Sequence, residues 1–111
     1  MLPVAAVYCD AADVDEAAGY REVHRPGSAY PLMTISTRAG MAVVHLFRED
    51  SCFLLNGDGI VDPSESWDFR ILDIDAAFTG EFICDAKRAE DVVEAFLLGI
   101  DADELGTWTI R

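Results

Sequence analysis

Positive charge is what this sequence lacks most. Its 111 residues contain 8 Lys and Arg against 21 Asp and Glu, so the formal net charge is −13, and residues 56–111 carry −10 of it. A chain this acidic repels phosphate groups, which argues against direct nucleic-acid binding and against membranes rich in anionic lipid. The same field can steer a basic partner and accelerate its association. The alternative is that the acidity only maintains solubility.

Long apolar runs and cysteine pairs are missing as well. No run approaches the ~18 residues of a membrane span, and the start MLPVAAVYC has no basic region and too short an apolar run for a secretory signal. Cys9, Cys52 and Cys84 lie in apolar stretches and form no C-x-x-C pair. These features predict a reduced, cytoplasmic protein without a membrane segment.

Apolar residues are plentiful enough for one core. Hydrophobic residues make up 51% of the chain, which is too many for a disordered protein, and the length is that of one domain. We therefore expect a single domain over residues 1–111.

The order of elements predicts an α+β fold. We expect a mostly antiparallel sheet of about five or six strands, with a short N-terminal helix and a longer C-terminal helix packed on one face. The predicted strands are Val4–Tyr8, Tyr20–Arg25, Pro31–Thr37, Met41–Phe47, Ser51–Leu55 and Trp67–Ile74, and Trp108–Arg111 is expected to be a terminal strand or a tail. The predicted helices are Ala11–Ala18 and Ala86–Leu98.

The C-terminal helix has the clearest pattern. Asp85 is suited to the N-cap position and Gly99 to the position that follows the helix. Apolar residues recur at spacings of three and four and form one stripe, which predicts burial of that side. The stripe consists of Ala89, Val92, Val93, Phe96 and Leu97.

Catalytic and metal-binding motifs are absent from the sequence. His24 and His45 are the only histidines, and His45 lies within an apolar strand, which is typical of a structural histidine. No serine-hydrolase, phosphate-loop or dinucleotide-binding pattern occurs, and the cysteines and histidines are too scattered for a zinc finger. We expect a protein that is not an enzyme and needs no cofactor or metal.

One segment partly matches a calcium-binding loop. In Leu54–Glu65, Asp58 is fifth, Gly59 sixth and Glu65 twelfth, as in an EF-hand. Leu54 stands where the first carboxylate ligand belongs, and a strand precedes the loop instead of a helix. A calcium-binding or small-ligand module therefore remains an alternative to a plain turn between strands.

Two longer stretches resemble a known family. They are PLMTISTRAGMAVVHLF and EFICDAKRAEDVVEAFLLGIDADELGTW. In order and character, they are similar to polymorphic-toxin immunity proteins encoded beside nucleic-acid deaminase toxins, a family that includes the immunity protein of a double-stranded DNA cytidine deaminase. The matching features are the glycine-containing loop Asn56-Gly57-Asp58-Gly59, the helix end Phe96-Leu97 and the closing Leu105-Gly106-Thr107-Trp108.

The resemblance implies a non-catalytic inhibitor that binds one basic toxin domain, expected to be a cytidine deaminase, and covers its active-site cleft as a 1:1 complex. An acidic loop suits this role, because carboxylates can pair with Arg and Lys of the partner and a tryptophan can anchor the contact. The other reading of each acid is a solvated loop residue. An acidic adaptor in an unrelated complex is a further alternative. The candidate toxin-binding residues are Asp58, Asp62, Glu65, Trp67 and Asp68, with Asp73 and Asp75 as secondary candidates.

Overall fold

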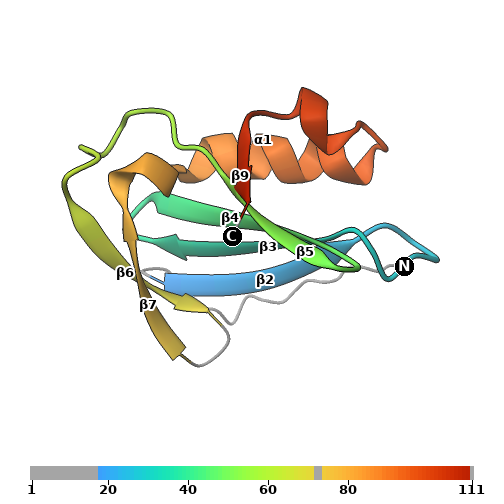
Figure 1. The fold of residues 1–111 in the computed structure, drawn as a ribbon, viewed down its shortest axis with the longest axis horizontal. Helices are drawn as coiled ribbons and strands as arrows, with labels where there is room; N and C mark the ends of the chain where they lie inside the picture. Colours follow the sequence, from blue (N-terminus) through green and yellow to red (C-terminus); the bar gives the residue numbers. More distant parts are fainter. Residues whose placement is uncertain (1–17, 72–73, 111) are drawn as a thin grey trace.

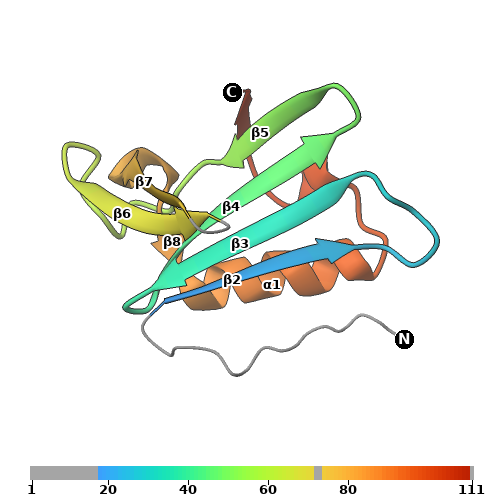
Figure 2. The ribbon, with the colours of Figure 1, turned by 90° about the horizontal axis from the view of Figure 1, so that it is seen from below.

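A six-stranded antiparallel sheet is the centre of the structure, a computed structural model that describes residues 18–71 and 74–110. Helix α1 covers one face of this sheet, and a two-stranded hairpin crosses the opposite face near one end (Figure 1, Figure 2). This arrangement confirms the predicted α+β class. In spatial order the strands are β2 (Ala18–His24), β3 (Leu32–Arg38), β4 (Met41–Arg48), β5 (Ser51–Leu55) and β9 (Trp108–Ile110), while β8 (Cys84–Asp85) pairs with the start of β4.

Short turns connect the central strands into a meander. Arg38 pairs with Met41, so only Ala39 and Gly40 connect β3 to β4. Both have positive φ, 51° and 81°, as a two-residue hairpin turn of this kind requires. Glycine adopts this conformation without steric cost, whereas the alanine is held in it by the pairing on either side.

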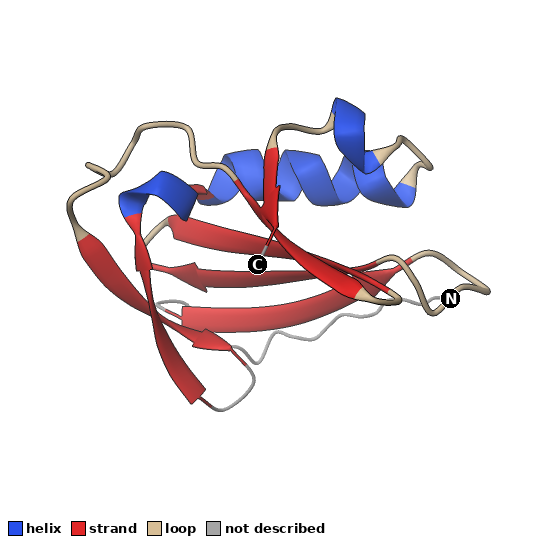
Figure 3. Ribbon diagram, viewed as in Figure 1, coloured by secondary structure: helices blue, strands red, loops and turns tan. Residues whose placement is uncertain are grey.

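Helix α1 (Ala86–Leu97) begins and ends close to the predicted positions. The Asp85 carboxylate accepts a hydrogen bond from the Lys87 backbone N–H at 2.8 Å, and Gly99 has a φ of 96° just beyond the helix. Figure 3 shows α1 running along one side of the strands. The helix stripe packs on the sheet in a largely aliphatic core that includes Met33, Ile35, Val44, Leu46, Ala89, Val92, Val93 and Phe96. Leu97, the last residue of the predicted stripe, is 41% exposed, so its predicted burial was wrong.

The opposite face packs on the hairpin of β6 (Ser66–Ile71) and β7 (Ile74–Thr79). The predicted strand Trp67–Ile74 is confirmed as far as Ile71 and wrong beyond it, because Ile71 pairs with Ile74 and the chain reverses between them. Apolar and polar residues alternate through this stretch without a Gly or Pro to mark the reversal, so the pattern reads as continuous. A second core lies here and consists of Val43, Leu54, Val61, Phe69, Phe78 and Ile83.

The remaining elements are short. Two 3₁₀ turns, η1 (Gly80–Phe82) and η2 (Ala102–Glu104), precede β8 and β9 respectively. The predicted strand Val4–Tyr8 and the predicted N-terminal helix lie outside the described residues, except for Ala18, which begins β2. Within residues 18–71 and 74–110, no helix has both the length and the apolar character that a membrane crossing requires.

Candidate acidic binding surface

The segment between β5 and β6 is a tightly packed loop. It lies against η1, where the Gly57 N–H donates to the Glu81 carbonyl at 2.7 Å and the Gly80 N–H donates to the Glu65 carbonyl at 2.9 Å. A Cβ on Gly57 would overlap the Ile83 carbonyl, and a Cβ on Gly80 would overlap the backbone oxygens of the loop. Only glycine permits this approach of two backbones. The loop therefore presents its side chains from a defined backbone.

Asp58 fastens the same loop to the start of the helix. One carboxylate oxygen, Oδ1, accepts from the Ile60 N–H, and the other, Oδ2, accepts from the Asp85 N–H, both at 3.1 Å. Asp85 itself caps α1. Asp58, a predicted partner-binding acid, thus has both oxygens engaged within the protein, and its first role is to position the loop.

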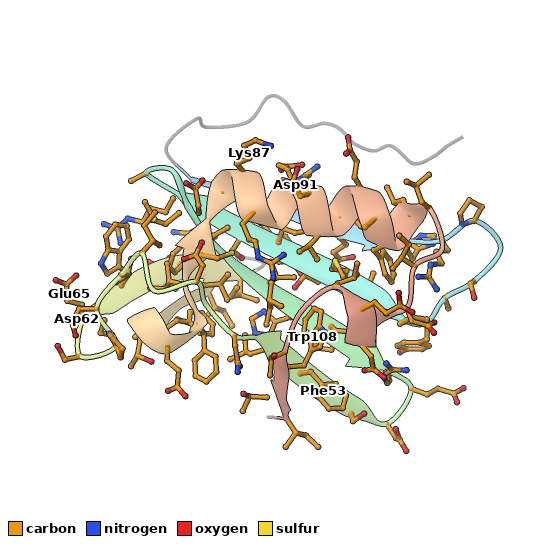
Figure 4. All side chains as sticks on the ribbon, turned by 90° about the horizontal axis from the view of Figure 1, so that it is seen from above. Phe53, Asp62, Glu65, Lys87, Asp91 and Trp108 are labelled. Carbon is orange, nitrogen blue, oxygen red and sulfur yellow. The ribbon has the colours of Figure 1, made fainter. Side chains whose placement is uncertain are left out.

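Asp62 organises the tip of the loop. Its Oδ1 accepts from the Ser64 N–H at 2.8 Å and from the Ser64 hydroxyl at 2.7 Å. These hydrogen bonds, that from the backbone first, lower the pKa of the exposed Asp62 carboxyl below its ordinary value. The side chain is therefore ionised throughout the physiological range. Figure 4 shows Asp62 and Glu65 close together at this end of the molecule, projecting from the loop.

The predicted residues of the hairpin have different environments. Asp68 is exposed on β6, on the side opposite to the core. Trp67 is half-buried and stacks on Phe69, with 6.4 Å between ring centroids, so most of its ring belongs to the second core rather than to a projecting anchor. Asp75 forms an ion pair with Arg70, Oδ1 to Nε 2.9 Å, which neutralises it. Asp73 lies outside the described residues.

Glu81 is an acidic residue of this surface that the sequence did not indicate. It is exposed in η1, and its carbonyl accepts the Gly57 N–H, which brings it beside the loop. Its position depends on contacts between segments far apart in the chain, so no local pattern could reveal it. We use the name acidic loop surface for Asp62, Glu65, Asp68 and Glu81.

The basic side chains of the described residues are engaged within the protein. Three form ion pairs, three donate to backbone carbonyls, and one lies over a phenyl ring. Only Arg38 among them contacts a residue of the acidic loop surface, at the Asp68 backbone carbonyl, and none of the ion pairs in the described part of the chain includes the four carboxylates of that surface. The ion pairs are Arg21 with Glu90, Arg70 with Asp75 and Lys87 with Asp91. The backbone carbonyls that accept are those of Phe96 and Ile100 from Arg25, of Asp68 from Arg38 and of Leu105 from Arg88. Arg48 lies over the ring of Phe53.

Other chemistries find little support in the described part of the chain. His45 is 6% exposed and packs against the rings of Phe47 and Phe78. Burial, and next to it the negative charge of Asp58, raises the pKa of the Cys84 thiol to about 12, which disfavours a nucleophilic thiolate. Leu54, at the first position of the EF-hand-like stretch, is a core residue of β5. Among the described residues, no group of three or more His, Cys, Asp or Glu could hold a metal ion.

Comparisons with protein-family models, with curated proteins and with solved structures give no match for this chain.

Proposed function

We propose that this protein is a non-catalytic inhibitor, an immunity protein that binds and neutralises a basic, nucleic-acid-directed toxin domain in the cytoplasm of the producing cell. The observation that supports this most is the acidic loop surface, whose four exposed carboxylates take part in none of the ion pairs of the described part of the chain. The resemblance of the sequence to deaminase-associated immunity proteins favours a cytidine deaminase as the partner.

Electrostatics explains how such a surface would inhibit. An enzyme that acts on nucleic acid needs a basic groove for the phosphate backbone. Carboxylates on an inhibitor can occupy that groove and pair with its Arg and Lys side chains. Opposite charges on inhibitor and toxin increase the association rate by about 10–10³-fold, and the increase falls as the salt concentration rises. A loop that is already ordered by Gly57, Asp58 and Gly80 loses little conformational entropy on binding.

The first experiment is co-expression with the C-terminal domain of the protein encoded immediately upstream. We expect survival of the cells and co-purification of a 1:1 complex. A deamination assay on the toxin released from that complex would then identify the chemistry. Cell death together with the lack of a complex would contradict the proposed function for this pair.

Charge reversal tests the contribution of the surface. Asp62→Lys with Glu65→Lys is expected to slow association by about 10-fold at low salt and to flatten its salt dependence. Glu94→Lys with Asp101→Lys changes the net charge equally at the end of α1, and we expect a smaller effect from it. Equal association rates for the two double variants would show that the acidic loop surface does not belong to the interface.

A further inference from the structure

The outer edge of β9 is an unprotected strand edge within the described structure. β9 is the last strand in the order of the sheet and pairs with β5 alone. The Asn56 N–H donates to the Thr107 carbonyl at 2.8 Å, and Thr109 lies opposite Leu54 in the same ladder. Because backbone groups alternate in direction along an antiparallel strand, the N–H and C=O of Trp108 and Ile110 point away from β5.

Apolar side chains accompany these outward backbone groups. Ile110 is 66% exposed and lies opposite the half-buried Phe53. Trp108 is held in place by a hydrogen bond from its Nε1 to the Ala102 carbonyl at 2.9 Å. Figure 4 shows Phe53 and Trp108 next to each other on this side of the sheet. The edge therefore combines unpaired backbone groups with an ordered apolar surface.

The strand at the other end of the sheet, β2, differs from β9 in that it carries charged residues. β2 carries Arg21 and Glu22, and charges on an edge strand discourage the addition of another strand. The three residues of β9, Trp108 to Ile110, carry no charge. In this acidic protein, the edge without charges is thus the one most suited to accept a further strand.

Acidic residues lie beyond both ends of β9. Asp103 and Glu104 belong to η2, which the Trp108–Ala102 hydrogen bond holds beside the strand. Glu49 and Asp50 form the turn between β4 and β5, just beyond the pairing of Phe53 with Ile110. All four are exposed. Arg48 is the basic side chain at this end among the described residues, and it lies over the Phe53 ring.

We infer that the outer edge of β9 binds an extended, basic segment of a partner protein by strand addition. Backbone hydrogen bonds with Trp108 and Ile110 would provide affinity, and the flanking acids would select Lys and Arg on the added strand. A second copy of this chain is a poor occupant, since each copy carries a net charge of −13. The inference depends on this edge and its charges, so it holds whether or not the partner is a toxin.

A displayed library of random peptides, selected on the purified protein, tests the inference without the toxin. We expect enrichment of peptides rich in Lys and Arg that alternate with β-branched residues. On binding, hydrogen exchange at the Trp108 and Ile110 amides should slow markedly, whereas the Thr109 amide, already within the ladder, should change little.

Two variants of Ile110 distinguish the contribution of its backbone N–H to peptide binding from that of its side chain. Ile110→Pro removes the outward N–H and leaves the ladder with β5 intact, whereas Ile110→Ala retains the N–H. Peptide affinity should fall at least about 10-fold further in Ile110→Pro than in Ile110→Ala. Equal affinities, unchanged amide exchange, enrichment of non-basic peptides only, or self-association through β9 would overturn the inference. Failed rescue in the toxin assay would contradict the proposed function and leave this result unaffected.

Discussion

Helix α1 and the β6–β7 hairpin cover opposite faces of one sheet, but they are attached to it in different ways. The helix contacts the sheet through aliphatic side chains such as Ile35, Val44 and Val92. Polar contacts join its outer side to β2 and the residue that follows β2, since Arg21 pairs with Glu90 and Arg25 donates to the Phe96 carbonyl. The hairpin contributes Phe69 and Phe78 and is also docked by side-chain hydrogen bonds to its backbone. These run from Ser36 Oγ to the Arg70 carbonyl and from Arg38 Nη1 to the Asp68 carbonyl, both at 2.9 Å.

The difference shows which kind of contact tolerates change. Where a helix packs through apolar side chains, neighbouring side chains can shift to accommodate a substitution. The loop and η1 beside the hairpin meet backbone to backbone at Gly57 and Gly80, where no side chain can give way. The face that carries the acidic loop surface is therefore the one with the stricter local requirements.

Removal of one large ring from each face gives the largest expected effect. Phe96→Ala on the helix face and Phe69→Ala on the hairpin face should each lower the free energy of unfolding by about 4 kcal/mol, because both rings are buried. Urea denaturation followed by circular dichroism and by tryptophan fluorescence measures both. A cost below about 1 kcal/mol for Phe69→Ala alone would mean that the hairpin is not part of the cooperative fold.

Gly80→Ala isolates the close backbone approach. We expect a loss of about 3 kcal/mol, because the added methyl group would overlap the loop carbonyls of Val61 and Asp62. Gly27→Ala is the matched control: this glycine has a φ of 77° and open space around it, so only the backbone conformation costs energy, about 1 kcal/mol. Equal losses in the two variants would show that the loop can move away from η1.

Asp58→Ala tests whether this acid positions the loop. It should lower the free energy of unfolding by about 1 kcal/mol, since the Ile60 and Asp85 N–H groups lose their acceptor. Asp68→Ala provides the comparison, because its carboxylate makes no hydrogen bond with the described residues. Thermal melts of both variants give the difference, and equal melting temperatures would contradict the structural role of Asp58.

The last effect is confined to alkaline pH and concerns a buried thiol on the helix face. Cys84 packs in the helix-side core, and burial raises the pKa of its thiol from 9.0 to about 12. Above pH 9 the thiol ionises in the unfolded chain while it stays protonated in the folded one, so stability should decline as the pH rises towards 12. Cys84→Ala should show a shallower alkaline decline in urea titrations. An identical slope would refute this contribution of Cys84.

Local sequence patterns predicted much of the structure on the helix face. The Asp85 cap, the apolar stripe and Gly99 depend on residues within a few positions of one another, so the limits of α1 could be predicted within one residue. The strand Ser51–Leu55 was predicted with its observed limits, because short apolar runs between turns have few alternatives in a meander.

The candidate site could be predicted only in part from local sequence patterns. Asp62, Glu65 and Asp68 were predicted to contact a partner. All three are exposed, and their contact with a partner stays a prediction. The pairing of Asp75 with Arg70 and the packing of Trp67 on Phe69 depend on the reversal into β7, for which the chain has no glycine or proline signal.

The sequence by itself determined the acidity of the protein, the sheet meander and the capped helix, since charge is additive and these elements arise from neighbouring residues. Only the tertiary structure decided which acids remain available to a partner. Asp58 is engaged by the N–H of Asp85, and Glu81 is brought beside Gly57, through contacts between residues more than twenty positions apart. Such contacts follow from packing of whole elements, and no pattern within one segment encodes them.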